Sequence, residues 1–122
     1  MSKRSFKTGA AAHLPVQPRD FLILFALAGG KLHGHGMLKA IESASGGVLI
    51  DPANLYRSLR RLDRDGLVSE QKASASDTRS RRREFALTDL GRAVFEAEAG
   101  RLARLADEAR SRRLIPGIRG ER

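Results

Sequence analysis

Arginine side chains that could bind a polyanion are concentrated in two short stretches of the sequence. The stretch "DPANLYRSLRRLDRDG" at 51–66 holds four arginines together with an asparagine and a tyrosine, and "RSRRR" at 79–83 holds four more. A guanidinium group can pair bidentately with guanine or with a phosphate, and an asparagine side chain can pair with adenine. Basic faces also occur on ordinary surface helices, so the elements that carry these arginines decide what they can do.

Residues 51–66 have the pattern of one amphipathic helix. Asp51 suits the N-cap, Pro52 the first turn and Gly66 the position beyond the end. At about 100° per residue, the arginines fall opposite a narrow apolar arc. That arc is formed by Leu55, Leu59 and Leu62. The pattern predicts a helix with one buried leucine face and one exposed arginine face.

The neighbouring segments predict a three-helix unit followed by a hairpin. Helices are expected at 17–28 and 34–45, with at most a bridging strand at 48–50. Beyond the third helix, "LVSEQKAS" and "EFALT" indicate two strands around the arginine-rich loop, and a helix follows over 89–113. Three helices and a two-stranded wing form the winged helix-turn-helix plan, whose third helix lies in the major groove of DNA.

We therefore expect a mostly α-helical chain with a small β-hairpin and a long C-terminal helix. Its parts would be a disordered basic arm at 1–14, the winged helix-turn-helix at 15–88, a dimerisation helix at 89–113 and a tail at 114–122. The apolar stripe on the last helix predicts pairing with the first helix of a second copy. The expected dimer contacts are Phe21, Phe25, Val94, Phe95, Leu102 and Leu105.

The composition favours a nucleic-acid partner over several other classes of protein. Lysine and arginine number 23 against 14 acidic residues, which gives a net charge of +9 and an attraction to polyanions. The chain has no cysteine, so disulfides and thiol chemistry are excluded. The apolar run at 21–28 is too short to span a bilayer. Pro15 and Pro18 separate this run from the basic N-terminus, which favours a buried helix over a signal peptide. We therefore expect a cytoplasmic protein.

The sequence indicates neither a catalytic site nor a metal site. The acidic residues are scattered beside arginines and there is no glycine-rich phosphate loop, so we expect no enzyme activity and no cofactor. His33 and His35 would point apart on a helix, without a pair of carboxylates to complete a metal shell. We expect His33 instead to cap or pack against the start of the second helix.

Three segments resemble the PadR family of transcriptional regulators: "LHGHGMLKAIE" at 32–42, "DPANLYRSLRRLDRDGLV" at 51–68 and "RRREFALTDLGR" at 81–92. The resemblance implies a dimeric winged helix-turn-helix, usually a repressor, whose C-terminal helix packs against the partner subunit. Some members of the family release DNA when a phenolic or other aromatic ligand binds. Gly34 and Gly36 would hold the tight turn into the second helix.

By position, the resemblance places part of the third helix and the wing on DNA. The expected DNA contacts are Asn54, Tyr56, Arg57, Arg60, Arg61, Arg79, Arg81, Arg82 and Arg83. The partner would be double-stranded DNA with a pseudo-palindromic operator, since a two-fold dimer presents its recognition helices about one helical turn apart. His35, Asn54 and Glu84 depart from the usual residues of the family, and Asn54 could change the contacts to bases or phosphates.

Two expectations concern other partners. Phe21, Phe25 and Phe95 could line a pocket for a small aromatic effector in a dimer, although their spacing also suits an ordinary core. The alternative function is a winged-helix interaction protein whose basic face binds RNA or a protein. Rising salt separates the two, because a duplex reader keeps a sequence preference while a purely electrostatic binder loses all affinity together. A membrane-surface role lacks a suitable basic amphipathic helix, apart from the mixed C-terminal one.

Overall fold

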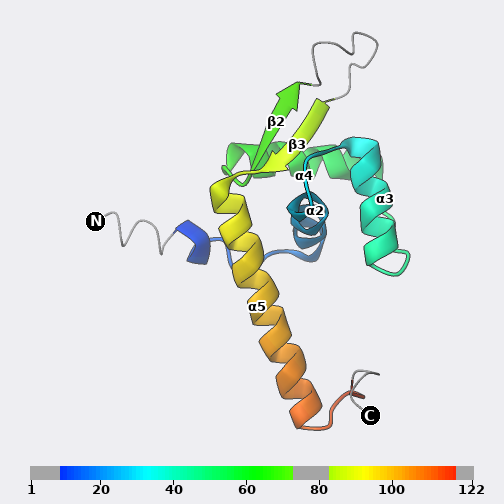
Figure 1. Ribbon diagram of the computed structural model, residues 1–122, viewed down its shortest axis with the longest axis vertical. Coiled ribbons are helices and arrows are strands. Elements are labelled where there is room, and N and C mark those ends of the chain that lie inside the picture. Colours follow the sequence, from blue (N-terminus) through cyan, green and yellow to red (C-terminus); the bar gives the residue numbers. More distant parts are fainter. Residues whose placement is uncertain (1–8, 73–82, 118–122) are drawn as a thin grey trace.

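The computed structural model describes residues 9–72 and 83–117 and has the winged helix-turn-helix arrangement (Figure 1). Its elements are α2 (Pro18–Ala28), β1 (Leu32–His33), α3 (Gly34–Ala44), α4 (Pro52–Arg64), β2 (Val68–Lys72), β3 (Arg83–Leu87) and α5 (Asp89–Ser111). The mostly helical fold class is confirmed. The three helices, the two hairpin strands and the long last helix lie where the sequence predicted them.

Side-chain caps fix the starts of the helices. The Asp51 carboxylate accepts hydrogen bonds from the backbone N–H groups of Ala53 at 3.0 Å and Asn54 at 3.3 Å, at the start of α4. The Thr88 hydroxyl accepts one from the N–H of Gly91 at 2.9 Å, at the start of α5. These caps satisfy backbone donors that have no partner inside the helix.

The strands form one antiparallel sheet in the order β1-β3-β2. Residues 48–50, for which the sequence allowed at most a bridging strand, form no strand, and β1 at Leu32–His33 pairs with Phe85 and Glu84 instead. Residues 48–50 follow two glycines with positive φ, Gly46 and Gly47, that turn the chain away from helix geometry. The short strand before α3 instead meets the open edge of β3 directly.

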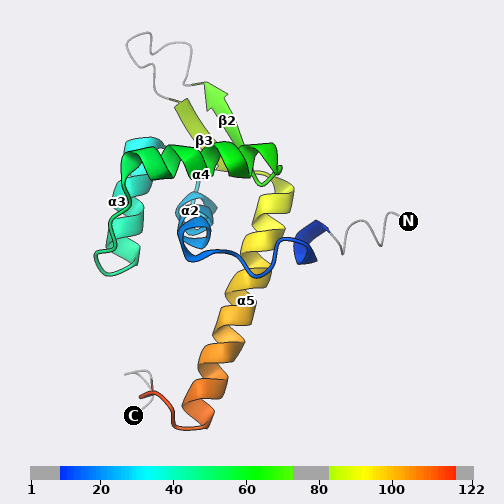
Figure 2. The same cartoon turned by 180° about the vertical axis from the view of Figure 1, so that it is seen from behind.

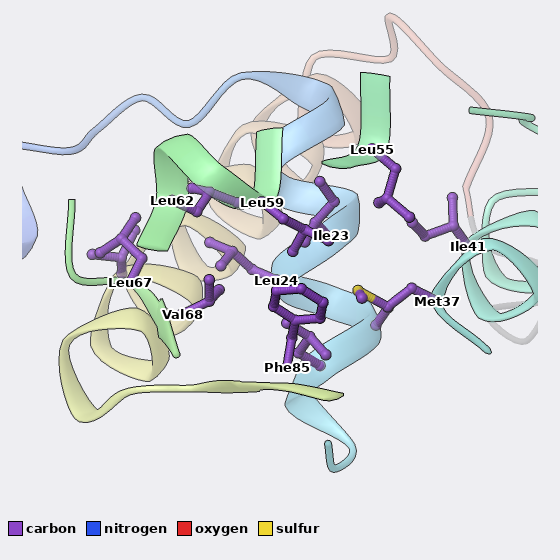
Figure 3. Close-up of a cluster of buried hydrophobic side chains, with 13 residues drawn as sticks. Ile23, Leu24, Met37, Ile41, Leu55, Leu59, Leu62, Leu67, Val68 and Phe85 are labelled. Atoms are coloured by element: carbon purple, nitrogen blue, oxygen red, sulfur yellow. The ribbon is translucent and has the colours of Figure 1, made fainter. Parts of the chain in front are cut away.

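The core gathers around α2, which lies between α3, α4 and α5 (Figures 1 and 2). Ile23, Leu24 and Leu27 of this helix are at most 1% exposed. Figure 3 shows the side chains that surround them from α3, α4 and the sheet, among them Met37, Leu55 and Phe85. Burying each such side chain stabilises the fold by about 1.5–3 kcal/mol. The leucine face predicted for α4 is confirmed, with all three leucines at most 2% exposed.

Helix α5 consists of a half packed against the body and a half that projects from it (Figures 1 and 2). The first half contacts α2 and β3. In the projecting half, Leu102 is 39% and Leu105 is 55% exposed. Val94 was expected at a dimer interface, and this expectation is wrong because Val94 is completely buried in the core of one chain.

The chain before α2 is attached to α5, which differs from the disordered arm expected at 1–14. Residues 9–11 are helical and Leu14 packs against the core, whereas residues 1–8 lie outside the described ranges. The backbone N–H of Val16 donates to Oε2 of Glu98 at 3.2 Å. Arg101 donates to both carboxylate oxygens of Glu98 at 2.7 Å. Glu98 is 1% exposed, so this buried carboxylate ties the N-terminal segment to the helix where α5 leaves the body.

Glu98 should make stability depend on pH. The hydrogen bonds from Arg101 lower the pKa of Glu98, against the opposing effect of burial. A carboxyl group whose pKa is lowered by folding stabilises the protein above its unfolded pKa, and this stabilisation is lost as the pH falls through the folded pKa. As the pH is lowered below about 5, we expect the free energy of unfolding to decrease more steeply for the wild type than for Glu98→Gln.

The measurement is urea denaturation at a series of pH values. Glu96→Gln is the control, because Glu96 lies exposed on the same helix. Parallel pH profiles for the wild type and Glu98→Gln would contradict the assigned role of Glu98.

Candidate nucleic-acid interface

Helix α4 and the β2–β3 hairpin, which is the wing, lie at one end of the molecule, and the projecting half of α5 lies at the other (Figures 1 and 2). On α4, the side chains of Arg57 and Arg60 are exposed on the face opposite the buried leucines. The positive ends of both side chains are therefore accessible to a large anion.

Asn54 and Arg57 form a pair on the outer face of α4. A guanidinium nitrogen of Arg57 donates to Oδ1 of Asn54, one turn earlier in the helix. Reading adenine requires an acceptor and a donor from the same amide. With Oδ1 accepting from Arg57, the two N–H donors of the Asn54 amide suit a phosphate or a base acceptor.

Arg61 has a different environment from the other expected DNA contacts. It donates to both carboxylate oxygens of Asp20 on α2, at 2.9 and 3.1 Å. Asp20 is 7% exposed, and its hydrogen bond with Arg61 raises the pKa of the guanidinium. A bidentate pair with a buried carboxylate commits Arg61 to holding α4 against α2. The sequence pattern missed Asp20, because its partner lies 41 residues away.

Tyr56 connects three elements. It is 41% exposed, and its ring lies 6.5 Å from that of Phe85 on β3. Its hydroxyl end fits against Gly34 at the start of α3, where a Cβ would lie only 2.0 Å from the hydroxyl oxygen. Tyr56 therefore sets the position of α4 relative to α3 and the wing, in addition to offering an exposed ring edge.

The base of the wing adds a second charged surface. Between α4 and the sheet lies a hollow of about 330 Å³, with Leu59 and Phe85 as apolar walls and charged side chains beside them. Those charged residues are Arg60, Asp63, Glu70 and Arg83. Glu70 accepts a hydrogen bond from Arg83, which raises the pKa of Arg83. The other expected wing contacts, Arg79, Arg81 and Arg82, lie outside the described residues.

The three phenylalanines proposed for a ligand pocket are brought together between α2 and α5. The rings of Phe21 and Phe95 stack with centroids 5.4 Å apart, and Phe25 meets Phe95 edge-on at 6.1 Å. Phe25 is 46% exposed, so the cluster presents an aromatic surface rather than a closed core. Leu114 and Ile115, which follow α5, are also exposed and were missed in the sequence because they lie beyond the periodic stripe.

His33 has a structural position at the start of α3. The Nδ1 atom of His33 accepts a hydrogen bond from the N–H of Gly36 at 3.2 Å and caps α3, as predicted. In the described ranges, no group of three or more histidine and acidic side chains is arranged to hold a metal ion. Within the same ranges, no helix has the length and apolar character needed to cross a membrane.

A family model described as the transcriptional regulator PadR-like family matches residues 23–97, from α2 through α4 and the β2–β3 hairpin into α5. The chain belongs to the PadR-like family of transcriptional regulators. An uncharacterized 37.1 kDa protein of a Streptomyces fradiae transposon is 41% identical over 87 residues, which are 71% of this PadR-like chain and 24% of that protein. The chain thus spans about a quarter of the length of that relative.

Solved structures show the same PadR-like fold. A PadR family transcription regulator from Clostridium difficile is 17% identical with a TM-score of 0.65, over 75% of this chain and 94% of that one. Bacillus subtilis PadR in complex with operator DNA is 20% identical with a TM-score of 0.58, over 66% of this chain and 46% of that one.

Gly34→Ala should displace the Tyr56 side chain from its place between α3 and β3. The added Cβ would overlap the end of the tyrosine ring, so the ring must turn outward and lose its contact with Phe85. Tyr56 is the only tyrosine and the chain has no tryptophan, so tyrosine fluorescence and near-ultraviolet dichroism report on this residue. We expect a changed signal and a loss of stability of about 1 kcal/mol.

Gly36→Ala is the matched control, because the nearest atom to its Cβ would be at an ordinary 3.5 Å. An unchanged tyrosine signal in Gly34→Ala would contradict the packing role of Tyr56.

Proposed function

We propose that this PadR-like chain is a dimeric, sequence-specific DNA-binding repressor that reads its operator with α4 and the wing. The observation that carries the proposal is the division of α4: its leucines are buried in the core, while Arg57 and Arg60 remain exposed on its outer face. A helix of this kind can enter the major groove with its arginines toward base edges and phosphates. The wing then lies over the adjacent backbone and minor groove.

The projecting half of α5 supports a dimer. Leu102 and Leu105 are exposed there, and Phe25 on α2 adds an exposed aromatic side chain. A second copy related by a two-fold axis would bury these surfaces and place two recognition helices on one face of DNA. The operator would then be pseudo-palindromic.

The aromatic surface between α2 and α5 supports a small-molecule effector. Phe21, Phe25 and Phe95 present ring faces and edges at the junction between the DNA-binding unit and the proposed dimerisation helix. A flat aromatic ligand that stacks here would change the angle of α5 and with it the spacing of the two recognition helices. Release from the operator follows when that spacing no longer matches one turn of DNA.

Arg60 and Arg82 should contribute to DNA binding in different ways. Arg60→Ala removes a side chain that the proposal places at base edges, so discrimination between the operator and a mutated duplex should fall by about 1–3 kcal/mol. Arg82→Ala, in the part of the wing known only from the sequence, should weaken all duplexes alike and lower the salt slope by about 1. Fluorescence anisotropy titrations at several salt concentrations measure both effects. Equal losses of specificity in the two variants would contradict the assigned roles.

Leu102→Ser combined with Leu105→Ser should weaken dimerisation and operator binding together. Serine removes the apolar surface whose burial drives the pairing of α5 with the second copy. Analytical ultracentrifugation measures the dimer, and Leu49→Ser is the control because Leu49 is 75% exposed on the loop between α3 and α4. A dimer of unchanged strength in the double variant would refute the proposed interface.

A further inference from the structure

The hollow between α4 and the wing contains a carboxylate at a place where the proposed function requires DNA phosphate. The major and minor grooves of a duplex are separated by one phosphate backbone. A protein that puts α4 in one groove and the wing in the next therefore faces that backbone with the surface between them. In this chain, that surface is the hollow beside Arg60 and Arg83.

Two arginines in the hollow are matched by two acidic side chains, Asp63 and Glu70. Glu70 holds Arg83 directly through a hydrogen-bonded ion pair. The Glu70 side chain is 29% exposed and that of Arg83 is 69% exposed, so the pair lies at the surface where an incoming anion can reach it. A carboxylate bound to an arginine cancels the attraction of that arginine for DNA phosphate until the carboxylate is displaced.

The strand register explains why Glu70 points to this hollow. Glu70 on β2 lies directly opposite Phe85 on β3, and directly opposite residues share one face of an antiparallel sheet. Arg83 lies two residues before Phe85 and shares that face as well. Glu84 alternates to the other face, where it pairs with Lys31 at 3.7 Å.

We propose that Glu70 is an electrostatic restraint on DNA binding: it holds Arg83 at the hollow, and a backbone phosphate must displace it before the wing arginine can bind. This inference rests on the proposed function, since it assumes a duplex across α4 and the wing. The exchange of carboxylate for phosphate weakens binding to every duplex by the same factor. Sequence preference is then left to the base contacts of α4. The restraint also limits the nonspecific attraction between DNA and this chain, whose net charge is +9.

The test compares Glu70→Gln with the wild type in titrations of an operator duplex and an unrelated duplex over a range of salt concentrations. A neutral glutamine holds Arg83 less strongly, so one more phosphate contact and one more released counterion become available. The expected result at about 0.15 M salt is a gain in affinity of about fivefold for each half-site on both duplexes, with a salt slope steeper by about 0.9. An exposed ion pair contributes little to folding, so thermal unfolding should be nearly unchanged.

Two comparisons separate the restraint from a general effect of charge. Glu84→Gln makes the same charge change on the opposite face of the hairpin, and the Glu84 side chain is also 29% exposed. It should leave affinity nearly unchanged. In an Arg83→Ala background, Glu70→Gln should no longer tighten binding, because the arginine that it releases is absent.

Equal gains from Glu70→Gln and Glu84→Gln, or a gain that persists without Arg83, would overturn the restraint in favour of simple repulsion. If the wild type prefers the operator but Glu70→Gln binds no more tightly than the wild type, the inference is overturned and the proposed function stands. A wild-type protein that prefers no duplex at any salt concentration would overturn the proposed function, and the inference with it.

Discussion

Helix α4 has to bury one face while it carries a dense positive charge on the other, and the rest of the structure depends on how these demands are met. Its leucines pack into the core beside α2. Arg61 adds a bidentate pair with the largely buried Asp20, so that α2 and α4 are joined by charge as well as by apolar contact. Removing Arg61 would leave the Asp20 carboxylate, whose side chain is only 10% exposed, without compensation for its charge. Arg57 and Arg60 then remain on the outer face.

The positive charge at the end formed by α4 and the hairpin is organised by neighbouring side chains. Asn54 holds Arg57, Asp20 holds Arg61 and Glu70 holds Arg83. A held guanidinium loses less conformational freedom when it binds, while a carboxylate partner also reduces its attraction to any passing polyanion. Asn54 orients the Arg57 guanidinium without neutralising its charge. Asp20 and Glu70 orient their arginines and also neutralise their charge. At the opposite end, the projecting half of α5 exposes Leu102 and Leu105 among charged side chains. The buried Glu98 fixes the N-terminal segment at the point where α5 projects from the body.

Local signals allowed most of the fold to be predicted, and long-range pairs account for what was missed. Asp51, Pro52 and the leucine arc act within one helix, so the start and the buried face of α4 could be read from spacing alone. The role of Arg61 depends on a carboxylate 41 residues away, and Glu98 holds a backbone group 82 residues away. Val94 shares its periodicity with Leu102, yet only the first half of α5 is covered by the body. Spacing identifies an apolar face, but it does not reveal whether the same chain or a second copy covers it.

The central claim is that α4 and the wing read a two-fold operator. It is tested most directly by selecting bound duplexes from a random pool at near-physiological salt and sequencing them. The account predicts an enriched motif with two-fold symmetry and half-sites about one helical turn apart, about 10 base pairs between centres. The absence of any enriched motif, together with binding that vanishes as salt rises, would contradict it. The arginine face of α4 would then be a general polyanion surface.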